Sequence, residues 1–177
     1  GGSLELLMHC HYLVAVDDAL FGMPEVTLPV LPGMDGCHWP FRKAEPSQWP
    51  RVVRLLLTGE PVRAKDAVNW LVDYSGSMQD ALATAWSLAS GSATGVTKRK
   101  LNEGILKDVP AEAGIPVSDN PATEAARKAI MDSIRESCGV PLPEALDLQA
   151  RRCADFFTTS FCKHGTIGTE HQRTMMV

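Results

Sequence analysis

Strand-forming segments are few and short in this chain, and this scarcity constrains the fold most strongly. Residues 12–16 and 19–21 have the apolar, β-branched character of short strands. Residues 26–31 also have strand character, but prolines interrupt them and predict an extended loop. Two or three short strands cannot form a sheet that covers itself. We therefore expect an α/β fold whose sheet is completed by a segment outside these 177 residues.

Helical patterns dominate the remainder of the chain. A glycine stop after residue 58 and a proline at residue 121 support two of the helix boundaries. Residues 91–120 combine prolines with a short basic run and predict an insertion or lid-like excursion. The predicted excursion separates a core region, residues 1–90, from a C-terminal helical region, residues 121–177. The tail from residue 165 is expected to be irregular. The predicted helices are residues 3–11, 51–57, 64–70, 77–89, 121–137 and 142–158.

Composition narrows the class of protein. With 45% hydrophobic residues the chain can bury a core. A formal net charge of -4 argues against general nucleic-acid binding, which needs a basic face. The five cysteines include no CxxC pair, so we expect reduced thiols rather than a disulfide framework or a zinc site. We see no apolar run of membrane-spanning length and no signal peptide, and expect a cytoplasmic protein.

Two glutamates stand out in apolar surroundings. Glu5 lies in the first turn of a helix entered through Gly1-Gly2, and Glu25 follows a Gly-x-Pro turn. Desolvation raises a carboxyl pKa and suits such a group to acid–base work. Backbone N–H groups at a Gly-Gly helix start can also stabilise a developing negative charge. From spacing alone, however, Glu5 could simply favour the helix dipole and Glu25 could face solvent.

Several ordered motifs resemble those of the crotonase (enoyl-CoA hydratase/isomerase) superfamily. They occur with the family's spacing over most of the chain, apart from about residues 91–120 and the last dozen. The motifs are residues 1–6 (GGSLEL), 15–26 (AVDDALFGMPEV), 31–33 (LPG), 55–62 (LLLTGEPV), 64–67 (AKDA) and 142–146 (LPEAL), with the last extending to Gly165.

The resemblance implies the C-terminal part of a ββα spiral that binds acyl-CoA thioesters. Gly2 matches the second of two backbone donors to an enolate-like intermediate, whereas the first donor lies upstream of this helix in the family. Glu5 matches the residue that positions or deprotonates water, and Glu25 the one that exchanges the proton at the carbon alpha to the thioester. Because isomerases of the family mainly need the second glutamate, the presence of both favours hydration of 2-enoyl-CoA. CoA would arrive with the substrate, and no separate cofactor or metal is implied.

The loop after Pro32-Gly33 departs from the family's usual Ala-Gly-Gly-Thr-Gln-Arg, since it reads Met-Asp-Gly-Cys-His-Trp over residues 34–39. Candidate substrate-binding residues are Met23, Gly33, His38 and Trp39, although a structural role for His38 is the more common alternative. The basic residues 98–100 could contact a CoA phosphate or simply face solvent. His9 and His11 point in different directions on a helix, which argues against a shared metal.

Other functions stay open at this point. The divergent loop and the insertion are compatible with an acyl-CoA isomerase or with a C–C bond or ring-opening hydrolase. A non-catalytic fragment or subunit is a further alternative. The expected partners are an acyl-CoA substrate and a missing N-terminal segment or complementary chain. By resemblance we also expect a homo-oligomer, a trimer or hexamer formed through the C-terminal helices, without nucleic-acid or membrane partners.

Overall fold

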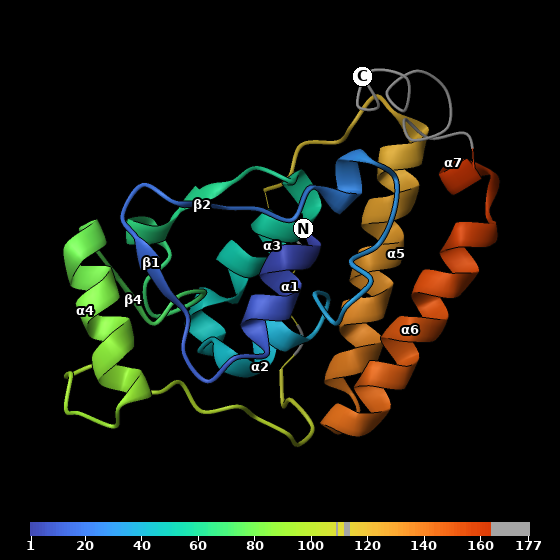
Figure 1. Ribbon diagram of the computed structural model, residues 1–177. Helices are drawn as coiled ribbons and strands as arrows, with labels where there is room; N and C mark the ends of the chain where they lie inside the picture. Colours follow the sequence, from blue (N-terminus) through green and yellow to red (C-terminus); the bar gives the residue numbers. More distant parts are fainter. Residues whose placement is uncertain (109, 112–113, 164–177) are drawn as a thin grey trace.

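The computed structural model describes residues 1–108, 110–111 and 114–163. Figure 1 shows three neighbouring groups of elements: short strands with α4, a central group of α1, α2 and α3, and the long helices α5 and α6. In chain order the elements are α1 Gly2–Met8, β1 Val14–Val16, β2 Leu20–Phe21, the 3₁₀ turn η1 Pro24–Thr27, α2 Trp39–Lys43, the 3₁₀ turn η2 Pro46–Gln48, α3 Trp49–Thr58, β3 Val62–Arg63, the 3₁₀ turn η3 Ala64–Asp66, β4 Tyr74–Gly76, α4 Met78–Ala89, α5 Pro121–Cys138, α6 Leu142–Thr158 and α7 Ser160–Lys163.

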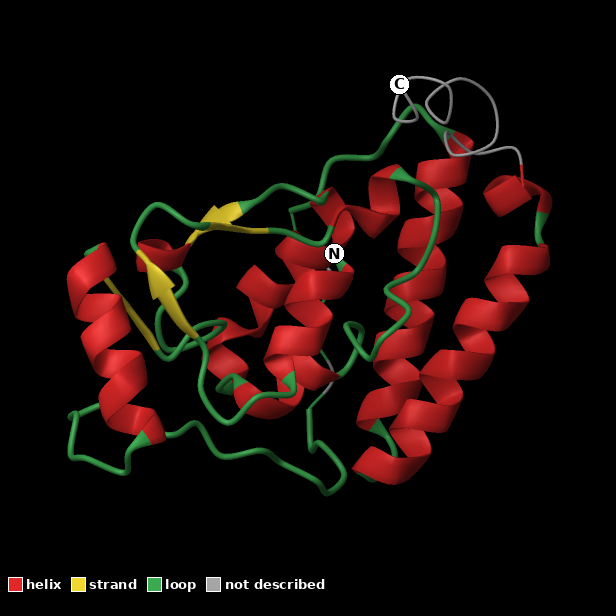
Figure 2. Cartoon of the chain, viewed as in Figure 1, coloured by secondary structure: helices red, strands yellow, loops and turns green. Residues whose placement is uncertain are grey.

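The strands form two separate pairs (Figure 2). β1 pairs in parallel with β4, with Val14 opposite Tyr74, whereas β2 pairs antiparallel with β3, with Leu20 opposite Arg63. Parallel sheets are normally covered on both faces and contain more strands than this. The described strands are therefore few for an α/β domain, in agreement with the scarcity read from the sequence.

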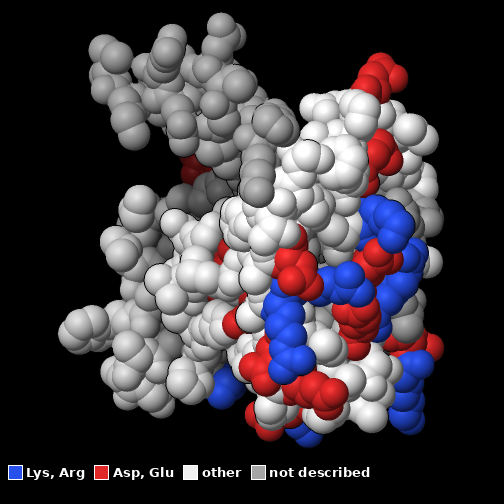
Figure 3. All heavy atoms as spheres, turned by 90° about the vertical axis from the view of Figure 1, so that its right-hand side faces the viewer, with Lys and Arg blue, Asp and Glu red and all other residues white. Residues whose placement is uncertain are grey.

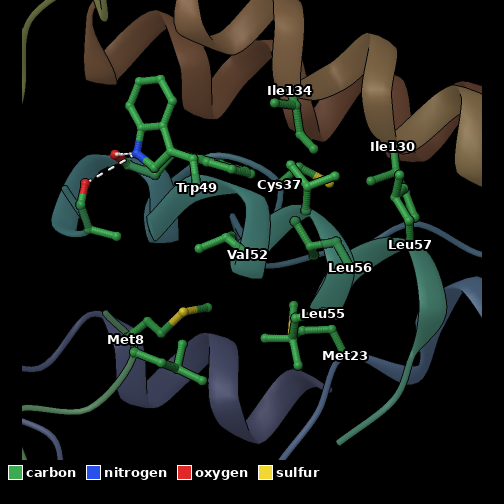
Figure 4. Close-up of a cluster of buried hydrophobic side chains, with 14 of the residues drawn as sticks. Met8, Met23, Cys37, Trp49, Val52, Leu55, Leu56, Leu57, Ile130 and Ile134 are labelled. Atoms are coloured by element: carbon green, nitrogen blue, oxygen red, sulfur yellow. Dashed lines mark hydrogen bonds between the residues drawn. The ribbon is translucent and has the colours of Figure 1, made fainter. Parts of the chain in front are cut away.

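Helix α3 lies at the centre of the hydrophobic core. Figure 4 shows its apolar side chains between Met8 of α1 on one side and Ile130 and Ile134 of α5 on the other. The helix begins at Trp49, whose buried indole Nε1 donates hydrogen bonds to backbone oxygens of the preceding segment. It ends at Gly59, which adopts a left-handed φ of 71° that favours glycine. A local sequence signal, Gly59, thus marks the C-terminal end of this central helix.

Helices α5 and α6 run antiparallel and pack against each other (Figure 1). α5 also contacts α3 and η1, and so joins the C-terminal helices to the rest of the core. On the face viewed in Figure 3, acidic and basic side chains are interspersed. The ion pairs Lys128–Asp132 and Arg152–Glu136 belong to α5 and α6. This face does not present the continuous basic surface that phosphate backbones attract.

Most predicted helices are confirmed within a few residues: α1, α3, α4, α5 and α6 all correspond to predicted segments. The described part of residues 91–120 contains no helix or strand. The division into three regions stays a prediction, and the tail from residue 165, including Gly165, lies outside the described residues.

The predicted helix at residues 64–70 is wrong. Only η3 forms there, and the chain then turns at Asn69, which has a φ of 70°. Asparagine enters this left-handed conformation more easily than most residues, and the turn ends helical geometry. Trp70 folds back so that its indole donates to the backbone oxygen of Asp66. The hydrophobic pattern of the sequence also gave no indication of α2 or β4. Both elements depend on contacts with distant parts of the chain.

Candidate active site

Glu5 is a buried carboxylate in the first turn of α1, with only 2% of its surface exposed. Its Oε1 atom accepts hydrogen bonds from the backbone N–H groups of Met34, at 2.8 Å, and Gly36, at 2.9 Å. Both donors belong to the loop that departs from the family pattern. The helix brings the carboxyl group inward, and the loop fixes the direction in which one of its oxygens points.

Glu25 approaches Glu5 from a different element. It lies in the 3₁₀ turn η1, directly after Pro24, and is 9% exposed. Its Oε2 atom is buried and accepts no hydrogen bond from the described residues. A Cβ atom added to Gly1 would lie 3.5 Å from Glu25 Oε1, which places this carboxyl group beside the start of α1. The structure therefore brings both predicted carboxylates to the same end of the helix.

The pKa of Glu5 is raised above its ordinary value. Burial is the largest cause, because it penalises the charged form, and the negative charge of Glu25 raises the pKa further. The two N–H donors oppose this shift by stabilising the carboxylate. A carboxyl group with a raised pKa beside a second carboxyl group can both accept and return a proton, as acid–base catalysis requires.

A small hollow of about 290 Å³ adjoins the start of α1. Gly2 is the first residue of this helix, where backbone N–H groups have no partner within the helix itself. A ligand atom in the hollow could accept a hydrogen bond from such a group. The residues that line the hollow are Gly1, Gly2, Ser3, Leu4, Leu7, Leu20, Phe21 and Gly22.

Known proteins with similar sequences are longer than this chain. A probable enoyl-CoA hydratase of Mycobacterium bovis is 36% identical over 121 residues, which cover 60% of this chain and 46% of the relative. The alpha subunit of a fatty acid oxidation complex from Shewanella loihica is 29% identical over 179 residues, covering 90% of this chain and 24% of that subunit. The solved structure of EchA1_1 from Mycobacterium paratuberculosis superposes with a TM-score of 0.57 at 23% identity, covering 93% of this chain and 54% of that chain.

The chain is similar in sequence to part of proteins named enoyl-CoA hydratase, and this similarity is consistent with the C-terminal part of a crotonase-superfamily protein. Its sequence and its fold both agree with the crotonase motifs read above, although no family model matches it. It spans about half the length of the probable enoyl-CoA hydratase and of the solved structure. The predicted α/β crotonase fold, with a helical C-terminal region, is thereby confirmed.

The candidate substrate-binding residues of this chain do not gather at one place. Met23 is buried beside Gly36, where an added Cβ atom would come within 2.4 Å of the Met23 Cε atom. Gly33 is exposed on the loop, and a Cβ atom added there would have Cys153 Sγ as its nearest neighbour, at 3.9 Å. Met23 therefore lies close to Glu5, on the other side of Gly36, and Gly33 belongs to the same loop as the two donors.

His38 and Trp39 have surroundings that favour structural roles. Trp39 stacks on His9 with ring centroids 4.1 Å apart and donates from Nε1 to the backbone oxygen of Met8 at the far end of α1. His38 is 1% exposed, and burial, aided by the positive charge of Arg42 and by His9, lowers its pKa to about 3. A neutral imidazole is thus expected at neutral pH, and a substrate-binding role for either residue stays a prediction.

The basic run also has a partly structural use. Arg99 forms an ion pair with the buried carboxylate of Asp73, at 2.6 Å, and donates to the backbone oxygens of Trp70 and Leu71. Lys98 and Lys100 are exposed.

Within the described ranges, no group of three or more His, Cys, Asp or Glu side chains is arranged to hold a metal ion. None of the helices described is long and apolar enough to cross a membrane.

Sequence reasoning missed Gln149, a fully buried amide in α6 that contacts the loop carrying the donors to Glu5. A signal for it was present in the sequence. The buried positions of α6 are Ala145, Gln149, Cys153 and Phe156, which recur at helical spacing. A polar residue on an otherwise apolar helical stripe must find hydrogen-bond partners in the core, which marks it for a specific structural role.

Proposed function

We propose that the protein catalyses the reversible addition of water to a 2-enoyl-CoA thioester. The observation that carries this proposal is the convergence of two buried carboxyl groups, Glu5 and Glu25, from separate elements at the start of α1. Hydration needs one group to activate water and one to exchange a proton at the adjacent carbon. The similarity to proteins named as enoyl-CoA hydratases supports the same reaction class.

In the proposed step, Glu5 positions water and takes its proton while the water oxygen bonds to the carbon beta to the thioester. Glu25 gives a proton to the carbon alpha to the thioester, so that the double bond becomes a single bond. The N–H group of Gly2 would stabilise negative charge on the thioester oxygen, together with a donor from the segment that precedes this helix in the family. Addition of water is redox-neutral, so the step requires no electron carrier. CoA enters as part of the substrate.

The direct test is incubation of the intact protein with crotonyl-CoA. We expect the enoyl-thioester absorbance to fall and the product to gain the mass of one water molecule. A product of unchanged mass with a shifted double bond would instead identify an isomerase. Failure to consume crotonyl-CoA and longer 2-enoyl-CoA substrates would contradict the proposal.

Substitution of Gly36 by alanine should disturb the site without removing either carboxylate. The new Cβ atom would lie 2.4 Å from Met23 Cε, 2.8 Å from Glu5 Oε1 and 2.8 Å from Pro32 Cβ, so these groups must move. We expect kcat for hydration to fall about 100-fold, the scale of a misplaced catalytic group. Gly139→Ala is the matched control, because its nearest neighbour would lie at an ordinary 3.5 Å. Equal steady-state rates for the two variants would contradict this steric role of Gly36.

A further inference from the structure

Gln149 holds both ends of the loop that faces Glu5. Its Nε2 atom donates to the backbone oxygen of Pro32 at 2.7 Å, and its Oε1 atom accepts from the backbone N–H of Cys37 at 3.0 Å. The amide lies within α6, more than a hundred positions along the chain from the loop, and is fully buried. A single side chain thus closes residues 32–37 into a fixed loop.

The segment between these two anchors carries the donors to the carboxylate. The N–H groups of Met34 and Gly36 both point to Glu5 Oε1. Asp35, between them, has a φ of 70°, a left-handed conformation that is uncommon for a residue with a side chain. Both N–H groups can point to Glu5 only while Asp35 keeps this left-handed conformation. The loop would not readily keep it without the hydrogen bonds at its two ends.

We infer that Gln149 is a positioning residue that acts through the loop 32–37 on the carboxylate of Glu5. The inference rests on the proposed function, since Glu5 is the residue whose orientation matters for hydration. Gln149 itself makes no hydrogen bond to Glu5; its effect passes through Pro32 and Cys37 to the two N–H donors.

The chemistry of the two anchors explains why the residue is a glutamine. One anchor is a carbonyl oxygen and needs a donor, whereas the other is an N–H group and needs an acceptor. A side-chain amide supplies both, but an ionised glutamate supplies acceptors alone and methionine supplies neither in useful strength. Loss of the amide would leave a buried C=O and N–H unpaired, which favours movement of the loop towards water.

Loop movement has a measurable electrostatic consequence at Glu5. The two loop donors lower the pKa of Glu5, so their loss should raise it. The titratable side chains that act on this site are Glu25 from η1, Cys37 on the loop and Cys153 on α6. Burial raises the pKa of both thiols, so neither adds a negative charge beside Glu5 near neutral pH.

The test is Gln149→Met in the intact protein, studied by carbon-13 NMR of labelled glutamate carboxyl groups. The Glu5 signal is assigned by its loss in Glu5→Gln. We expect the pKa of Glu5 to rise, and the amide protons of Met34 and Gly36 to exchange faster with solvent. In the hydration assay, kcat should fall about 10- to 100-fold while KM changes less than about twofold.

Two further variants keep the result interpretable. Ile130→Val removes one methylene from the core of α5 and should leave the Glu5 titration unchanged although it also costs stability. Gln149→Asn adds no charge, but its amide is one methylene too short to reach both anchors, so it should shift the same observables if Gln149→Met does not fold. An unchanged Glu5 titration and unchanged Met34 and Gly36 exchange in a folded Gln149 variant would overturn the inference. A raised Glu5 pKa supports it even if the protein hydrates no enoyl-CoA, so failure of the proposed function is recognised separately.

Discussion

Glu5→Gln should lower kcat for hydration of crotonyl-CoA by about 10²–10⁴-fold, the usual contribution of a general base. The amide oxygen can still accept the hydrogen bonds from Met34 and Gly36, so the loop should keep its place. What the variant loses is the ability to take a proton from water. The measurement is steady-state kinetics with the intact protein over a range of substrate concentrations.

The same variant separates hydration from isomerisation. Moving a double bond in a 3-enoyl-CoA needs proton transfer at carbon but no activated water, so isomerisation should change less than about tenfold in Glu5→Gln. Glu25→Gln should impair both reactions. Glu45→Gln is the control, because this glutamate is exposed and lies outside the site. If Glu5→Gln hydrates at the wild-type rate, Glu5 is not the base.

Of the substitutions proposed for this protein, Arg42→Leu should cause the largest loss of folding stability. This arginine is 2% exposed and its guanidinium donates to four backbone oxygens, those of Asn102 at 3.0 Å, Gly104 at 2.6 Å, Ser137 at 2.8 Å and Val140 at 2.8 Å. It joins α2 to the excursion and to the end of α5. Removing it leaves these acceptors without their partner, and we expect the free energy of unfolding to fall by about 3–5 kcal/mol.

Urea denaturation followed by circular dichroism measures this loss. Arg54→Leu is the matched control, because its ion pair with Glu60 is exposed and should contribute less than about 1 kcal/mol. Arg42→Lys should recover only part of the loss, since one ammonium group cannot reproduce the planar fork of donors. Similar unfolding midpoints for Arg42→Leu and Arg54→Leu would show that the buried guanidinium does not hold these segments together.

The parts of the fold that could be predicted are those with local signals. Pro121 and Gly59 mark helix boundaries through their own backbone preferences, and α5 and α3 begin or end there. Glu5 and Glu25 could be selected because their sequence motifs resemble those of a known family. Their convergence and burial are found in the structure, whereas their catalytic roles stay predictions.

The parts that could not be predicted depend on distant residues. Asn69 ends a pattern that otherwise favours a helix, and nothing in its neighbours announces the left-handed turn. Arg42 and Gln149 have partners roughly 60 to 120 residues away, so local periodicity cannot reveal them. The trimeric or hexameric assembly, the acyl-CoA partner and the cytoplasmic location likewise stay predictions.

The central claim is that two carboxylates divide the work, with Glu5 acting on water and Glu25 on the carbon alpha to the thioester. The most direct measurement is exchange of the alpha protons of butyryl-CoA in D₂O, followed by proton NMR. A saturated thioester cannot be hydrated, so exchange isolates the carbon step. We predict that the intact protein and its Glu5→Gln variant exchange these protons and that Glu25→Gln does not. Exchange that survives in Glu25→Gln but is lost in Glu5→Gln would contradict this division of roles.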